Sequence, residues 1–196
     1  MAAGSSVRAR PRACTRSLVR ARTREALRDA RWVIGVTEGR AVGYELDLTT
    51  AAEQARARRL GAHARTLLAL AVIRRDGRVD RRRWQPTSRI PETARRANLD
   101  WALEILERAA SSREPVARAR YAEALARYEA RRAEARTILT EIAAADVMPD
   151  AWGYRVLAEL SDRTGDAAAR NQAISRCQAR AGADANVVCP RLVAVR

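Results

Sequence analysis

The chain has 196 residues, of which 47% are hydrophobic, and a net charge of +15. That length and apolar content are ample for a packed core, either as one domain or as a short repeat array. All 38 basic residues are arginine, so the absence of lysine excludes the phosphate-binding loop that depends on one. The longest apolar run, Leu67 to Ile73, is too short to cross a bilayer, and we expect no membrane insertion.

Positive charge is concentrated in the first half of the chain. Residues 1–100 contain 23 arginines against 10 acidic residues, whereas residues 101–196 contain 15 against 13. Arginine and alanine have GC-rich codons, so codon bias explains the choice of arginine better than its uneven placement. A basic half can attract nucleic acid, anionic lipid or an acidic partner through a field that salt screens. The competing interpretation is a solvated surface with a disordered tail.

The N-terminus is strongly basic. Its first 24 residues contain seven arginines, and no acidic residue comes before Glu25. We expect residues 1–16 to form a disordered basic arm. The same composition resembles an organelle transit segment, and it also fits a start codon assigned too far upstream.

Residues 17–77 are expected to form an arginine-rich helical region. Apolar residues recur at helical spacing over residues 23–36, which predicts a first helix. Apolar residues also alternate on both sides of a turn at residues 37–40. That alternation fits a hairpin at 32–48, as an alternative to irregular helix and loop.

A second helical segment follows at Thr50. Thr50 and Glu53 have the spacing of a capping box, in which each side chain bonds the other residue's free backbone N–H. Gly61 is expected to break this helix after about Leu60. A further helix is then predicted over residues 63–75.

Residues 78–91 are predicted to be a basic, proline-containing linker. Pro86 and Pro91 forbid a continuous helix there. An aromatic residue beside three arginines is typical of single-strand or phosphate binding, through charge and stacking. The candidate nucleic-acid contacts are therefore Arg81, Arg82, Arg83 and Trp84.

Residues 92–182 carry a strong helical pattern with regular breaks. Pro115 and Pro149 are 34 residues apart, and each begins an alanine-rich helix, a short break and a second helix. Breaks at Ser111-Ser112 and Gly165-Asp166 separate the other helices. Residues 183–196 form a C-terminal tail, expected either to dock as a terminal cap or to fray.

This period resembles that of the tetratricopeptide repeat family over roughly residues 50–182. Ala124, Ala135, Ala158 and Ala169 stand where that family places small residues between paired helices. The resemblance implies an all-α fold of antiparallel helical hairpins stacked as a short solenoid. A simple four- to six-helix bundle would share the same apolar stripes and short loops.

The resemblance also implies a non-catalytic module that docks a peptide or partner protein, either on its own or as one part of a larger regulator. The first helix of each unit would line a groove, which makes the candidate partner-binding residues Arg118, Trp152, Arg155, Glu159 and Asp162. Tryptophan and arginine are the residue types that most often anchor such interfaces. The alternative function is nucleic-acid binding by the basic N-terminal half. The sequence leaves the partner's identity and the oligomeric state open.

Catalytic and cofactor chemistry has little support in the residues. His63 is the single histidine, and it falls in an ordinary amphipathic segment, so we predict no enzyme activity, no cofactor and no metal. Cys14, Cys177 and Cys189 lack metal-type spacing. We expect them to be reduced thiols in a cytoplasmic protein, although Cys177 and Cys189 could pair in an oxidising compartment.

Overall fold

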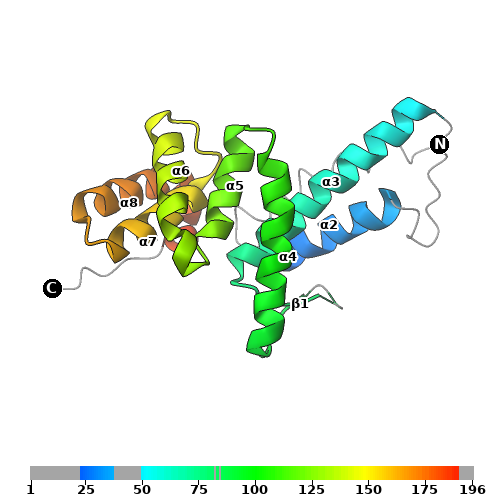
Figure 1. The fold of residues 1–196 in the computed structure, drawn as a ribbon, viewed down its shortest axis with the longest axis horizontal. Coiled ribbons are helices and arrows are strands. Elements are labelled where there is room, and N and C mark those ends of the chain that lie inside the picture. Colours follow the sequence, from blue (N-terminus) through cyan, green and yellow to red (C-terminus); the bar gives the residue numbers. More distant parts are fainter. Residues whose placement is uncertain (1–22, 38–49, 82, 84, 190–196) are drawn as a thin grey trace. The chain divides into compact units, whose positions relative to one another are not determined.

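The computed structural model describes residues 23–37, 50–81, 83 and 85–189 of the chain. Most of these residues are α-helical, with two short 3-10 helices and one two-stranded sheet, which confirms the predicted all-α class (Figure 1). The chain divides into two compact units, and the division falls between Ile105 and Leu106, inside a helix. The predicted basic arm at 1–16 lies outside the described residues.

The N-terminal unit contains three helices and a short antiparallel strand pair within its described part. Their bounds are α2 (Thr23–Thr37), α3 (Ala51–Arg74), β1 (Val79–Asp80), β2 (Gln85–Pro86) and α4 (Glu92–Ala110), the last of which continues into the C-terminal unit. Helix α2 packs along α3 and also contacts β2.

Helix α2 corrects the hairpin that the sequence suggested at 32–48. Residues 32–37 are helical, so the first strand of that hairpin does not form. Ala30, Val33 and Val36 are buried at helical spacing, whereas Trp32 is only half-buried. The three-residue period of the buried side chains therefore outweighs the alternation. The second predicted strand lies outside the described residues.

Helix α3 begins as predicted, at a capping box. The Glu53 backbone N–H donates to Thr50 Oγ1 at 3.2 Å, and the Thr50 backbone N–H donates to Glu53 Oε2 at 3.0 Å. The predicted break at Gly61 is wrong, because α3 is one continuous helix. A Cβ at this position would lie 2.9 Å from Thr37 Oγ1, so Gly61 permits a close approach of α2.

The predicted linker at 78–91 is fastened to α4 within the N-terminal unit. Helix α3 ends in a tight turn, where Asp76 and Gly77 have positive φ angles of 53° and 73°. Arg95 of α4 donates to Asp76 Oδ2 at 3.0 Å. The buried Asn98 side chain donates from Nδ2 to the carbonyls of Gly77, at 2.8 Å, and Val79, at 2.7 Å. The segment after α3 is thus held by buried hydrogen bonds, and the division between units falls later, within α4.

The C-terminal unit continues from the end of α4 with two helical hairpins and a short C-terminal segment. Their bounds are α5 (Pro115–Leu125), η1 (Glu129–Arg131), α6 (Arg132–Ala144), α7 (Ala151–Arg163), α8 (Ala167–Ala181), η2 (Gly182–Asp184) and α9 (Ala185–Val188). Helix α5 packs on α6, and α7 packs on α5, α6 and α8. The second hairpin therefore lies against both helices of the first (Figure 1).

Small side chains form much of the interface inside this unit. Ala119, Ala122, Ala124 and Ala135 are fully buried, and they let the helix backbones approach closely. Pro115 occupies the first turn of α5, as predicted. Gly165, at φ 71°, and the N-cap Asp166 form the predicted turn between α7 and α8.

Candidate partner-binding site

The N-terminal turn of α7 is fixed by its own cap and by the helix that follows. Asp150 Oδ1 accepts from the Trp152 backbone N–H at 2.9 Å, which begins α7. In α8, Arg180 donates to the Met148 carbonyl at 2.9 Å, just before that cap. The first side chains of α7 therefore have a defined direction.

Three of the predicted partner-binding residues meet on one face of α7. The guanidinium of Arg155 lies over the Trp152 ring, 4.7 Å from its centroid, and Arg155 Nε donates to Glu159 Oε1 at 2.8 Å. We call Trp152, Arg155 and Glu159 the α7 face. Spacings of three and four residues bring these side chains onto one side of the helix. Trp152 is buried and does not face outward as the sequence interpretation expected.

The chain's own C-terminal segment lies against the α7 face. Helix α9 contacts both α7 and α8, and Arg155 Nη1 donates to the Val188 carbonyl at 3.4 Å. Val188 is completely buried, and Trp152 is only 7% exposed. Helix α9 therefore lies against the α7 face at Arg155. The described part of the predicted tail is thus docked.

A disulfide joins this segment to α8. Cys177, in the middle of α8, is bonded to Cys189, and their Cα atoms are 6.0 Å apart. The expectation that both are reduced thiols is therefore wrong for this structure. Sequence alone did not distinguish the two states, because pairing requires the chain to turn back after Gly182 and bring α9 over α8.

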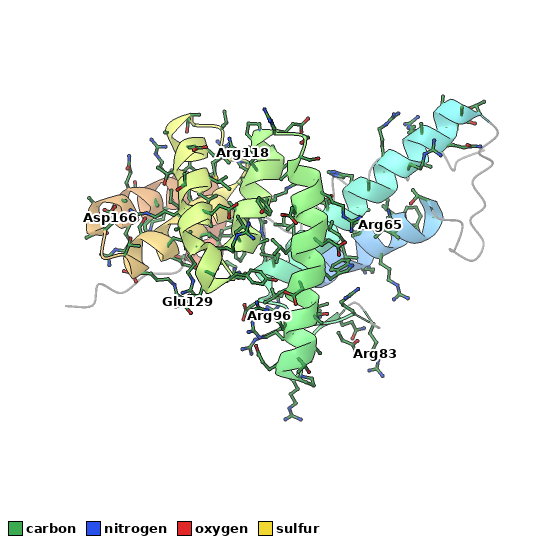
Figure 2. The ribbon with its side chains drawn as sticks, in the orientation of Figure 1. Arg65, Arg83, Arg96, Arg118, Glu129 and Asp166 are labelled. Atoms are coloured by element: carbon green, nitrogen blue, oxygen red, sulfur yellow. A yellow bond between two sulfur atoms is a disulfide. The ribbon has the colours of Figure 1, made fainter. Side chains whose placement is uncertain are left out.

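The other two predicted partner-binding residues have different neighbours. Asp162, near the end of α7, pairs with Arg170 of α8 at 3.0 Å. Arg118 of α5 pairs with Glu141 of α6 at 2.6 Å. Figure 2 shows Arg118 at the α5–α6 hairpin. Both arginines join the two helices of a hairpin.

A small cavity of about 170 Å³ lies between α6, α7 and α8. Its lining includes Thr140, Tyr154, Leu157, Gln172 and Arg176. Arg176 donates to the Ala143 carbonyl at 2.6 Å and lies 6.0 Å from the centre of the Tyr154 ring. The sequence analysis did not predict this cavity, because its polar lining residues come from three separate helices.

The predicted nucleic-acid contacts do not gather into one described surface. Arg81 is half-buried and stacks on Trp101 of α4, 4.4 Å from its centroid, and burial lowers the pKa of its guanidinium. Arg83 is exposed in the turn between β1 and β2, where its backbone N–H donates to Asp80 (Figure 2). Arg82 and Trp84 lie outside the described residues.

Exposed arginines are present on a different element, between residues 56 and 65 of α3. Arg56, Arg58, Arg59 and Arg65 are all exposed there, and Glu53 is the only acidic residue of the helix. Figure 2 shows Arg65 on α3. The signal for this surface was present in the sequence, as four arginines within ten residues of a helix.

The described residues contain no cluster of three or more histidine, cysteine, aspartate or glutamate side chains able to hold a metal ion. No helix in the described part of the chain is both long and apolar enough to span a membrane. Comparison of the chain with protein-family models, curated proteins and solved structures finds no match.

Proposed function

We propose that the C-terminal unit is a protein-docking module, which binds a peptide segment of another protein along the α7 face. The observation that carries this proposal is the contact that α7 makes with the main chain of α9. A main-chain carbonyl of the chain is held by Arg155, and the valine that bears it is fully buried. A partner peptide longer than α9 would make the same contacts through a carbonyl and an aliphatic side chain, and its other residues would add contacts to Trp152 and Glu159.

The packing around α7 supports docking on this side of the helix. Helices α5, α6 and α8 pack against α7. Arg155 and Glu159 have 26% and 28% of their side chains exposed, although α9 lies beside them. An aromatic ring beneath a partly exposed arginine is typical of interface anchors, because it offers a large area to bury and forked hydrogen bonds.

The register of the two hairpins supports the tetratricopeptide-like interpretation. At the 34-residue offset, four pairs of buried hydrophobic positions coincide, namely Ala122 with Val156, Ala124 with Ala158, Leu139 with Ala173, and Ala143 with Cys177. A hairpin of this size buries its apolar face by stacking on a neighbour, and α7 contacts both helices of the first hairpin. We propose two such units in the C-terminal half, and a cytoplasmic setting for the module.

The docking proposal is tested with the full chain and a phage-displayed library of random peptides, selected in the presence of dithiothreitol. We expect enriched peptides that share an aliphatic position and lose at least tenfold in affinity on Arg155→Ala. Arg163→Ala is the matched control, because Arg163 is exposed on the last turn of the same helix. Failure to enrich any peptide, or equal losses for the two variants, would overturn the proposal.

A second candidate function is binding of single-stranded nucleic acid by the N-terminal unit. The exposed arginines of α3 favour it, since several cations on one exposed helix attract a phosphate backbone. The probe is a fluorescein-labelled oligodeoxynucleotide of about 20 nucleotides, long enough to span one binding groove. Binding to the full chain should weaken roughly tenfold or more between 50 and 200 mM salt.

Charge reversal separates this function from the general basicity of the chain. The double variant Arg56→Glu, Arg59→Glu should lose most of the anisotropy change. A double variant that reverses Arg113 and Arg163, both exposed in the C-terminal unit, should retain it. Equal losses for the two double variants would show that net charge, and not α3, binds the oligonucleotide.

A further inference from the structure

The segment that lies against the α7 face is short. Helix α9 has four residues, and a hydrogen bond of 2.8 Å from the Cys189 backbone N–H to the Ala185 carbonyl closes its one turn. Val188 is buried, but its neighbour Val187 is 58% exposed. An isolated helix this short does not hold its shape in water.

The non-covalent contacts of α9 to α7 are fewer than its contacts to α8. They include the 3.4 Å hydrogen bond from Arg155 and the burial of one valine side chain. Ordering several backbone residues has an entropic cost that one buried valine does not offset. The disulfide between Cys177 and Cys189 therefore carries much of the docking of this segment.

The two cysteines differ in what holds them when the bond is broken. Cys177 lies within α8, is 1% exposed, and has its Sγ 3.3 Å from the Ala151 carbonyl. As a thiol it could donate to that carbonyl and stay in the core. Cys189 follows the last turn of α9, so its position depends on that turn. Breaking the bond should release α9 and leave α8 in place.

We propose that the Cys177–Cys189 disulfide is a redox clamp that closes the α7 face with the chain's own C-terminal segment. A dithiol reductant supplies two electrons and two protons: the S–S bond breaks, Cys177 and Cys189 become thiols, and the dithiol becomes a disulfide. The released segment then uncovers Trp152, Arg155 and Glu159 for a partner peptide. This inference rests on the proposed docking function, and it names the regulation of that site.

The placement fits the known behaviour of disulfides in different compartments. In a reducing compartment a disulfide is usually transient and redox-sensing, whereas in an oxidising one it persists. The Cys177–Cys189 disulfide joins the C-terminal segment to α8 and does not join two core helices. On this proposal it can therefore open without unfolding the module. Reduction in the cytoplasm would leave the α7 face available, and oxidation would close it.

The test is amide hydrogen exchange of the full chain, with and without dithiothreitol, in a Cys14→Ser background that prevents disulfide exchange. Reduction should speed exchange at least tenfold for the amides of Val188 and Cys189. Exchange within α5 to α8 should change less than twofold. Cys189→Ser and Cys189→Ala should reproduce the reduced pattern without reductant, and the use of two variants guards against one that misfolds.

Two results would overturn the clamp. One is unchanged protection of residues 185–189 after reduction, which would mean that the segment docks without the bond. The other is an equal rise in exchange throughout α7 and α8, which would mean that the bond holds the fold together. The clamp is supported only where the segment opens and the helices stay protected.

The peptides selected for docking separate failure of the clamp from failure of the function. If they bind the oxidised chain and Cys189→Ser equally, the clamp is wrong and docking stands. If no peptide binds either form, docking is wrong, and hydrogen exchange still decides whether the segment opens. Binding at least tenfold tighter to Cys189→Ser supports both.

Discussion

The guanidinium of Arg155 lies 4.7 Å from the centroid of the Trp152 indole, within the first turn and a half of α7. The same side chain bonds Glu159 and the Val188 carbonyl, so Arg155 joins α7 to the C-terminal segment. Its role in stability can be measured separately from its proposed role in docking.

Arg155→Ala should lower the free energy of unfolding by about 1–2 kcal/mol, because it removes a cation–π contact and two hydrogen bonds of a partly exposed group. Urea denaturation of the full chain followed by circular dichroism measures this loss. Arg163→Ala on the same helix should change stability by less than about 0.5 kcal/mol, as exposed substitutions usually do. Equal values for the two variants would mean that the contacts of Arg155 contribute nothing net.

Asn98 supports a second prediction, in the N-terminal unit. Its Nδ2 faces two buried carbonyls, so Asn98→Ala should cost about 2–4 kcal/mol by leaving both acceptors without a donor. Asn98→Asp should cost more at pH 7 than at pH 4, because an ionised carboxylate repels those carbonyl oxygens and a protonated one can donate to one of them. Urea midpoints at the two pH values measure the difference.

The matched control for this position is Asn171→Ala. Asn171 is exposed on α8 and accepts from its neighbour Arg170. Its loss should change stability by less than about 0.5 kcal/mol. If Asn98→Asp showed no dependence on pH, its side chain would not face the carbonyls as the structure has it.

Some features of the fold were readable from the sequence because they are local. The capping box of Thr50 and Glu53 spans three residues, and the turn at Gly165 and Asp166 is set by adjacent side chains. Such signals depend on chemistry within one turn of the backbone. The capping box and the turn could therefore be predicted without knowing which other helices pack against them.

Other features depend on residues distant in the chain, and the sequence interpretation of them was wrong or incomplete. Gly61 was interpreted as a helix break, but it lies inside α3. A side chain at this position would collide with Thr37 of α2. Arg155 was placed on the correct face of α7, but its contact with Val188 crosses 33 residues. Residue spacing identifies neither Thr37 as the neighbour of Gly61 nor Val188 as the neighbour of Arg155. Helical periodicity indicates which side of a helix a residue lies on, but not which distant residue packs there.

The phenol of Tyr121 gives a prediction on pH dependence. Burial raises the pKa of Tyr121, repulsion from Glu134 and Glu107 adds to the rise, and Arg131 partly offsets it. The raised pKa favours the neutral phenol in the folded state, so its contribution to stability is complete below about pH 10 and is lost as the pH rises through the folded value.

Tyr121→Phe removes the ionisable group and should lose less stability than the wild-type chain between pH 9 and pH 11. Urea midpoints of both proteins at the two pH values test this directly. The hydroxyl also accepts from Arg131 at 3.0 Å, so the variant should start from a somewhat lower stability at pH 9. Parallel losses in the two proteins would show that Tyr121 ionises no later than an unfolded tyrosine.

Gly77 and Gly165 form a matched pair that separates backbone strain from steric contact. Both follow a helix with nearly the same positive φ, 73° and 71°. A Cβ at Gly165 would meet nothing within 4 Å, whereas one at Gly77 would lie 2.6 Å from the Arg95 carbonyl oxygen and 3.0 Å from Leu99 Cγ. Gly165→Ala should therefore cost about 1 kcal/mol, the usual penalty of a side chain in this backbone region.

Gly77→Ala should cost at least about 3 kcal/mol, because overpacking against a fixed backbone adds to the same strain. The difference between the two variants, measured by urea denaturation, isolates the steric part. It also reports on the packing of the turn after α3 against α4, since Arg95 and Leu99 both belong to α4. Equal costs for the two substitutions would mean that this turn can move away from α4 freely, against the hydrogen bonds that Asn98 makes to it.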